Sequence, residues 1–235
     1  MKNVFFLFLF FSFISCKGQT DASTKSDSYQ IGPEAFEKAI SSGNVQILDV
    51  RTSNEYNSGH IKNALQADWT NSIQFTDRIQ YVEKDKPVYI YCLVGGRSAS
   101  AADWMRKNGF KNVVELQGGI NAWKKAERPL EGSSNETQMT MEEYLAAISP
   151  NKITLVDFGA TWCPPCVKMA PIINELQNNK SLGFLLVKID AGIHTNLMKA
   201  LNIEPIPLFI IYKNGKEVWR KDGIVSLEEF LAQLN

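Results

Sequence analysis

Short apolar segments alternate with helical patterns through the first half of this chain, and this alternation constrains its fold most strongly. The continuous apolar runs are VQILDV (45–50), PVYIYC (87–92) and NVVEL (112–116). The helical patterns cover about 72–82, 98–108 and the segment GGINAW (118–123). Continuous apolar strands separated by helices are typical of a parallel sheet with helices on both faces. We therefore expect an α/β domain whose functional residues lie where the strands end.

Length and polar gaps indicate two domains. The chain has 235 residues, which suits two domains of about 100 residues each. The polar segment LEGSSNETQ (130–138) divides the chain, and the two halves share no internal repeat. We expect one domain at 29–131, a linker at 132–139 and a different domain at 140–235.

The charge composition argues against a nucleic-acid partner. Lys and Arg together number 25, as do Asp and Glu, and no long basic run appears. Proteins that bind nucleic acid concentrate basic residues to neutralise phosphates. We therefore expect small-molecule or protein partners instead.

The first 16 residues, MKNVFFLFLFFSFISC, indicate an export signal of the lipoprotein type. The apolar run from Val4 to Ile14 is too short to span a membrane, which takes about 20 residues, and it follows a lysine as in signal peptides. Ser15-Cys16 resembles the end of the lipobox of bacterial lipoproteins, although Phe13 and Ile14 depart from the usual residues. Residues 17–28 are polar and would form a tether.

This resemblance implies an exported protein that is anchored in a membrane through lipidated Cys16. The protein would face the periplasm or the cell surface, and the lysine after Cys16 favours the outer membrane. The alternative is ordinary cleavage near Gly18, without lipidation.

The segment YCLVGGRSAS (91–100) places Cys92 between a buried strand and a helix. A helix N-terminus presents unpaired N–H groups and partial positive charge, which lower the pKa of a cysteine and favour a bound anion. Gly95 and Gly96 let successive amides turn inward, and Arg97 adds a cation. We expect Cys92 to be a thiolate nucleophile. The alternative is a buried cysteine at a strand end, followed by a plain turn.

Three ordered motifs resemble the rhodanese family. They are ILDVRTSNEYNSGHIKNA (47–64), the C-x-x-G-x-R-S of the Cys92 loop, and LQGGINAW (116–123). The resemblance implies that Cys92 carries sulfane sulfur as a persulfide. The amides of the loop, from Leu93 and Val94 through Gly95 and Gly96, would cradle it, and Arg97 would stabilise an anionic donor such as thiosulfate.

The remaining residues of these motifs are expected to be structural. Asp49 and Arg51 would pair with each other and with loop backbone. His60, in the GHI turn, is assigned to architecture rather than to general-base catalysis. The six-residue C-x4-R loop favours sulfur over phosphate, for which related phosphatases use a longer C-x5-R loop.

The second half carries a C-x-x-C at another junction of strand and helix, in KITLVDFGATWCPPCVKMAPIINELQ. The helix N-terminus would lower the pKa of Cys163, and Cys166 lies close enough to form a disulfide. Pro164 and Pro165 fit the first helical turn, where N–H groups have no partner. Zinc would need about four ligands, and a purely structural disulfide is the other alternative. Neither a metal nor a cofactor is expected.

The segments VDFGATWCPPC and IPLFIIYKNG resemble thioredoxin-fold proteins over 140–235. The resemblance implies that Cys163 attacks, that Cys166 resolves and that Asp157 moves the proton. It also implies a cis Ile206-Pro207 bond beside the cysteines, with Pro207 and Trp162 contacting the substrate. Gly159 and Pro164 replace the usual tryptophan and glycine, so the partners need not be those of a general cytosolic thioredoxin.

The combined hypothesis is a membrane-tethered sulfurtransferase and thiol–disulfide oxidoreductase. Cys92 would take sulfur from thiosulfate or a persulfide, and the Cys163/Cys166 pair would reduce that persulfide or the disulfide of a protein or small molecule. One alternative is a disulfide reductase whose rhodanese-like domain only docks or senses. A further alternative is a tethered adaptor without catalysis.

Overall fold

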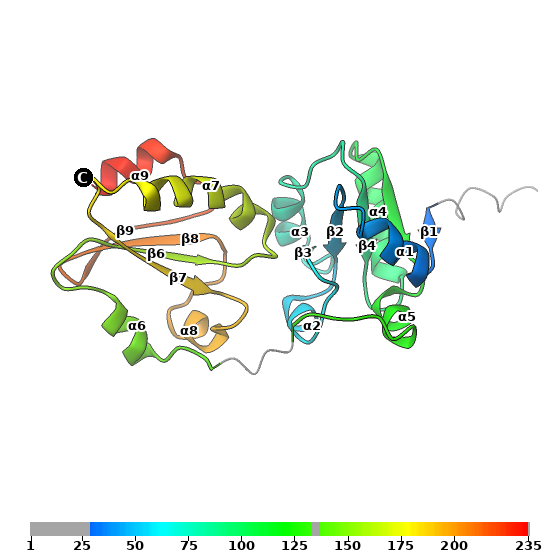
Figure 1. The fold of residues 1–235 in the computed structure, drawn as a ribbon, viewed down its shortest axis with the longest axis horizontal. Coiled ribbons are helices and arrows are strands. Elements are labelled where there is room, and N and C mark those ends of the chain that lie inside the picture. The colour runs from blue at the N-terminus through cyan, green and yellow to red at the C-terminus, as the bar shows by residue number, and fades with distance from the viewer. Residues whose placement is uncertain (1–28, 133–136, 235) are drawn as a thin grey trace, which may run out of the picture.

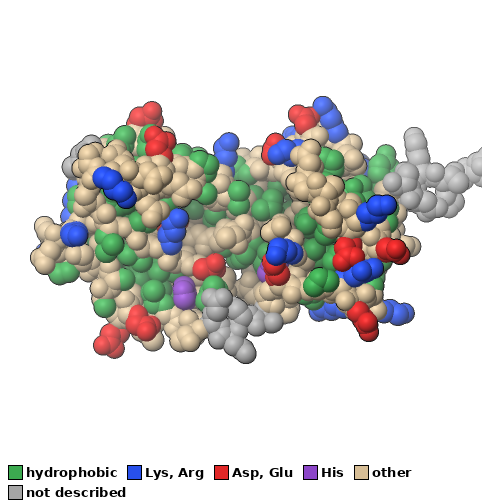
Figure 2. All heavy atoms as spheres, viewed as in Figure 1, with side chains coloured by type: hydrophobic (Ala, Val, Ile, Leu, Met, Phe, Trp, Pro, Cys, Tyr) green, Lys and Arg blue, Asp and Glu red, His purple; other side chains and the backbone are tan. Residues whose placement is uncertain are grey.

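The computed structural model describes residues 29–132 and 137–234, which form two α/β domains side by side (Figure 1). The expected signal peptide, Cys16 and tether lie outside the described residues, as does half of the expected linker, residues 133–136. Within the described ranges, no helix has the length and apolar character to cross a membrane. On the face drawn in Figure 2, Lys and Arg are interspersed with Asp and Glu.

The N-terminal domain is built on a five-stranded parallel sheet with the order β1-β5-β4-β2-β3. The strands are β1 (Gln30–Ile31), β2 (Gln46–Asp49), β3 (Ala64–Gln66), β4 (Val88–Tyr91) and β5 (Val113–Leu116). The helices are α1 (Pro33–Ile40), α2 (Ser53–Asn57), α3 (Ser72–Ile79), α4 (Gly96–Lys107) and α5 (Gly119–Lys125). This arrangement confirms the predicted parallel α/β sheet.

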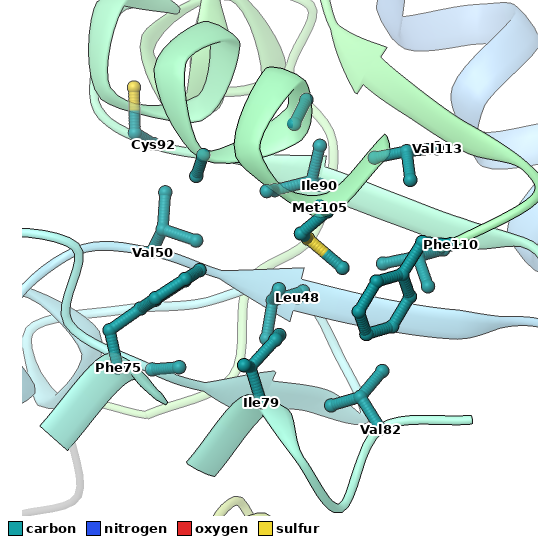
Figure 3. Close-up of a cluster of buried hydrophobic side chains, with 14 residues drawn as sticks. Leu48, Val50, Phe75, Ile79, Val82, Ile90, Cys92, Met105, Phe110 and Val113 are labelled. Carbon is teal, nitrogen blue, oxygen red and sulfur yellow. The ribbon is translucent and has the colours of Figure 1, made fainter. Parts of the chain in front are cut away.

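Helices cover both faces of this sheet because its strands are apolar on both sides. Residues of α3 and α4 pack with Leu48, Val50 and Ile90 on one face, and residues of α1 and α5 pack with Ile47 and Tyr91 on the other. Figure 3 shows the first of these clusters, with Cys92 at its rim and the sulfur pointing away from Leu48. The Cys92 sulfur therefore lies at the edge of this core, at the end of β4.

Helix α3 ends earlier than the sequence indicates. It stops at Ile79 rather than at Val82, and tight turns follow in which the Tyr81 and Val82 amides donate to the Arg78 and Ile79 carbonyls. Val82 is still buried in the core. Its apolar side chain continues the helical pattern although its backbone has left the helix.

A buried ion pair joins Asp49 at the end of β2 to Arg51. The Arg51 Nη2 atom lies 2.6 Å from Asp49 Oδ2, and both side chains are almost fully buried. The Arg51 backbone amide also donates to Asp49 Oδ1, and Nη2 donates to the Gly59 carbonyl. The pair thus ties the end of β2 to the turn before His60, as expected from the sequence.

The C-terminal domain has a four-stranded mixed sheet with the order β7-β6-β8-β9. The strands are β6 (Thr154–Gly159), β7 (Leu185–Asp190), β8 (Leu208–Lys213) and β9 (Lys216–Asp222). The helices are α6 (Met141–Ala147), α7 (Pro164–Asn178), α8 (Thr195–Ala200) and α9 (Leu227–Leu234). Helices α7 and α9 cover one face and α6 and α8 the other (Figure 1).

Local signals place these elements where the sequence predicts them. Thr140 and Glu143 form a capping box at the start of α6, which satisfies two otherwise free amides. Asn214 and Gly215 both have positive φ, +54° and +73°, as the two-residue turn between β8 and β9 requires.

Removing one charge of the buried pair should destabilise the N-terminal domain. In Asp49→Asn, the Arg51 cation stays buried without its carboxylate, and we expect a loss of about 3 kcal/mol in the free energy of unfolding. Urea unfolding of the full chain measures it. Glu83→Gln is the matched control, because its ion pair with Lys86 is exposed and should contribute little. Equal effects of the two changes would contradict this prediction.

Candidate functional site

Cys92 lies directly after β4 in a loop whose donors converge on its sulfur. The Gly95 amide donates to Cys92 Sγ at 3.1 Å and the Ser98 hydroxyl at 3.4 Å. Burial raises the pKa of the Cys92 thiol, but hydrogen bonds from Ser98, Gly95 and Val94 outweigh it, so the pKa lies below its ordinary value. The loop therefore favours the thiolate, as the sequence predicts.

Glycines give this loop its shape. Gly95 caps α4 with φ +111°, a conformation that side chains disfavour. A Cβ at Gly119 would lie 2.5 Å from the Cys92 carbonyl oxygen and 2.7 Å from that of Leu93. This close approach lets the Ile120 amide bond the Cys92 carbonyl at 2.9 Å. The GGINAW segment therefore fixes the Cys92 loop from outside it, a role that sequence reasoning missed.

Arg97 is held beside the loop by Glu55. Two hydrogen bonds of 2.8 and 2.6 Å join the guanidinium to both carboxylate oxygens. Arg97 holds the pKa of Glu55 at about 2 despite partial burial. Glu55 also accepts from the Thr52 amide, so it both caps α2 and positions Arg97. The sequence predicts Arg97 as an anion-binding residue but does not predict this partner.

The outer part of the loop is open. Leu93 and Val94 are 38% and 62% exposed, whereas Cys92 is 1% exposed. A molecule that reaches Cys92 thus passes two apolar side chains and the loop amides before it meets the sulfur.

In the C-terminal domain, Cys163 caps α7 and is joined to Cys166 by a disulfide. Pro164 and Pro165 occupy the first turn of α7. The Ile206-Pro207 bond is cis, and Cys163 Sγ lies 3.6 Å from the Ile206 carbonyl oxygen. Each of these features agrees with the expectation from the sequence.

Asp157 lies beside Cys166 at a cavity of the C-terminal domain. Burial raises its pKa to about 6, against an opposing effect of Lys188. Asp157, Gly159 and Cys166 line a cavity of about 320 Å³. A Cβ at Gly159 would lie 3.7 Å from Cys166 Sγ and 3.4 Å from Asp157 Oδ1. Because Gly159 has no side chain, the space between the carboxyl and Cys166 stays open.

Trp162, directly before Cys163, docks onto the N-terminal domain. Its carbonyl accepts from the Gln66 amide on β3 at 2.8 Å, and its ring lies 5.4 Å from that of Tyr56. The Arg78 guanidinium lies 5.2 Å from the centre of the same ring. Cys163 is fully buried in this arrangement. The edge of the N-terminal sheet therefore packs against the loop between β6 and α7 (160–163), which we call the redox loop.

This contact does not bring the two sulfur sites together. Asp49 on β2 lies opposite Gln66 on β3 and opposite Tyr91 on β4, so two strand spacings, roughly 10 Å, separate Gln66 from the strand that leads to Cys92. The docking residues Gln66 and Arg78 were not predicted as site residues. A signal existed for Arg78 alone, because it interrupts the apolar face of α3 between Phe75 and Val82.

Replacing Asp157 should change how stability depends on pH. The native carboxyl holds its proton up to about pH 6, whereas the ordinary pKa of an aspartate is 3.8. The stability that the protonated carboxyl contributes is therefore complete below pH 3.8 and is lost as pH rises through 6. In Asp157→Asn this loss disappears, and above pH 6 we expect a gain of about 2–3 kcal/mol over the parent. Urea unfolding of the oxidised chain between pH 4 and 8 measures it.

Asp222→Asn, at an exposed position, is the control and should follow the parent. A parent curve no steeper than that of Asp157→Asn between pH 4 and 6 would rule out the raised pKa.

Each half of the chain is similar in sequence to known proteins. It is 40% identical over 102 residues to the chloroplastic thioredoxin Y of Oryza sativa subsp. japonica, covering 43% of this chain and 60% of that protein. It is 29% identical over 160 residues to a tRNA uridine(34) hydroxylase of Streptococcus suis, covering 65% of this chain and 48% of that protein. The match thus spans less than two thirds of either relative.

A rhodanese-like domain protein from Staphylococcus aureus of known structure is 32% identical. The match covers 45% of this chain and 98% of that one, with a TM-score of 0.39. The family model for the rhodanese-like domain matches residues 32–126, and that for thioredoxin matches residues 135–235. The chain therefore contains a rhodanese-like domain followed by a thioredoxin domain.

Proposed function

We propose that this chain is an exported thiol–disulfide oxidoreductase coupled to sulfurtransferase chemistry. The observation that carries the proposal is the donor set around Cys92 Sγ, in a chain that also carries the Cys163–Cys166 disulfide. One centre favours a sulfur anion and the other exchanges two electrons. The proposal keeps Cys16 as the lipidated residue that anchors the protein at a membrane, facing the periplasm or the cell surface.

The first step loads sulfur onto Cys92. The thiolate attacks the outer sulfur of thiosulfate, a new S–S bond forms, the old S–S bond breaks, and sulfite leaves with its electron pair. The product is a persulfide anion on Cys92. The Gly95 amide and the Ser98 hydroxyl, which already donate to Sγ, provide donors next to the new charge.

The second step reduces that sulfur. The Cys163 thiolate attacks the outer sulfur of the persulfide, and Cys92 leaves as a thiolate. Cys166 then attacks Cys163 Sγ and hydrosulfide leaves, so two thiols are oxidised to one disulfide while the sulfane sulfur is reduced to sulfide. The proton of Cys166 passes to Asp157 across the shared cavity, and the leaving sulfur takes one proton from solvent, so that it departs as hydrosulfide. An external dithiol must then reduce the pair.

Direct transfer requires the Trp162 contacts to release, because Cys163 is fully buried while Trp162 is docked on the N-terminal domain. The same contacts favour a second candidate function. In that function the rhodanese-like domain is a docking module that covers the redox loop, and the thioredoxin domain alone is the catalyst.

Thiosulfate should load Cys92 with one sulfur atom. We expect intact-mass spectrometry of the reduced Cys163→Ser/Cys166→Ser chain, which cannot perform the second step, to show this gain, and a further Cys92→Ser change to abolish it. Ser98→Ala removes one donor to the thiolate, so loading should slow by roughly fivefold, the factor expected for a hydrogen bond of about 1 kcal/mol. A chain that gains no sulfur but still reduces disulfides would leave the docking module as the function. A chain that neither gains sulfur nor reduces disulfides would be an adaptor without catalysis.

A Cys166→Ser variant should trap the partner of Cys163. Without the resolving thiol, the mixed disulfide on Cys163 cannot be released by the second attack. We expect mass spectrometry of the variant, after exposure to an oxidised cell-envelope extract, to identify what is linked to Cys163. Cys163→Ser/Cys166→Ser is the control: it keeps Cys92 and should lose every adduct that Cys163 carries. The same adducts on both variants would place the reactive thiol elsewhere.

A further inference from the structure

A cavity of about 410 Å³ lies between the two domains, beside the redox loop. We call it the interdomain cavity. Its volume is in the range of small-molecule sites. Amide and hydroxyl side chains from both domains line it, namely Asn54, Asn57, Gln74, Thr195 and Asn202. These groups can hydrogen-bond a polar, peptide-like molecule, alongside apolar side chains such as Met198 and Ile203 that share the lining.

Arg78 gives this cavity a buried positive charge. It lines the cavity and is only 6% exposed. Its hydrogen bonds run from Nη1 to the carbonyl and side-chain oxygens of Gln66, and no carboxylate of the described residues lies within salt-bridge distance. Burial lowers the pKa of Arg78 to about 10, so the side chain remains charged at neutral pH. A buried cation without a paired carboxylate is costly, and an anionic ligand would offset that cost.

The interdomain cavity also touches the redox site. Trp162 and Ile206 line it, and Cys163 follows the first and lies 3.6 Å from the carbonyl oxygen of the second. The hydrogen bond from Gln66 already occupies the Trp162 carbonyl. A protein strand would have to displace this bond, whereas a small molecule can enter the cavity with the domains docked.

We propose that the interdomain cavity binds a small, carboxylate-bearing thiol derivative, a persulfide or mixed disulfide, with its carboxylate on Arg78 and its sulfur toward Cys163. The exposed Lys199 and Glu204 at the same cavity provide charges for a ligand that also carries an amino group. The reactive end of this inference rests on the proposed function: once the Trp162 contacts release and expose Cys163, the ligand's persulfide takes the place of the Cys92 persulfide, and the small thiol leaves. Binding itself does not depend on catalysis.

The test uses S-methylglutathione, a carboxylate-bearing thioether that cannot exchange sulfur. Isothermal titration of the oxidised full chain should show saturable binding at one site. Arg78→Gln should weaken the affinity by roughly tenfold or more, because it removes a charged hydrogen-bond donor. Arg78→Lys keeps the charge and should retain part of the affinity.

A second variant covers the case in which Arg78→Gln does not fold. Asn54 is exposed in the first turn of α2, where a carboxylate favours the helix, so Asn54→Asp should fold. It adds a negative charge to the cavity wall and should weaken binding several-fold. Asn112→Asp makes the same charge change at an exposed position outside the cavity and should bind as the parent does.

Absence of saturable binding, or equal affinity in the parent, Arg78→Gln and Asn54→Asp, would overturn the inference. The failure of the proposed function is distinguishable from this. If the chain loads sulfur on Cys92 but does not bind the probe, only the proposed ligand site is contradicted. If it binds the probe but transfers no sulfur, only the proposed coupled function is contradicted.

Discussion

The unpaired N–H groups at the start of a helix govern both sulfur centres of this protein. Cys92 lies just before α4 and receives the Gly95 amide, and Cys163 caps α7. Cys92 directly follows β4, and Cys163 follows β6 after a short loop, so each sulfur lies at the positive end of a helix. Hydrogen bonds of the loop lower the pKa of Cys92, and the place of Cys163 at the start of α7 would favour its thiolate once the disulfide is reduced.

The docking of Trp162 on β3 determines what can reach the second of these centres. Strand β3 is the edge of its sheet, and an unpaired edge strand offers free amides. The Trp162 carbonyl takes one of them, from Gln66, and its ring joins the cluster that contains Tyr56. One segment therefore completes the core of the first domain and closes the redox face of the second. Access to Cys163 is thereby coupled to how the two domains pack.

Sequence reasoning predicted the features that neighbouring residues determine. The two cysteine loops, the turn at Asn214-Gly215 and the capping box at Thr140 each depend on a few consecutive residues whose conformational preferences are known. The sheet and its helices followed from the apolar pattern, with α3 ending early because tight turns bury Val82 outside the helix.

The contacts that were missed join distant segments. Arg97 pairs with Glu55 on α2, Gly119 supports the Cys92 loop, and Gln66 meets Trp162 across the domain boundary. The C-x4-R motif indicates a cation near the sulfur but says nothing of the carboxylate that positions it. Only the packing of strands and domains determines these partners. The short strand β3, which provides the docking edge, has three residues and gives little apolar periodicity to detect.

The two cavities at the disulfide divide its chemistry between two sides. Asp157 and Cys166 share the cavity behind it, and Arg78, Trp162 and Ile206 line the cavity in front of Cys163. Thiolate displacement needs a sulfur compound to approach the Cys163 thiolate and a proton to leave Cys166. A cation in front favours a compound that carries a carboxylate, and a carboxyl with its pKa raised to about 6 behind can take the proton near neutral pH. The opposite arrangement would repel the carboxylate of the compound, and it would hold a positive charge where the proton must arrive.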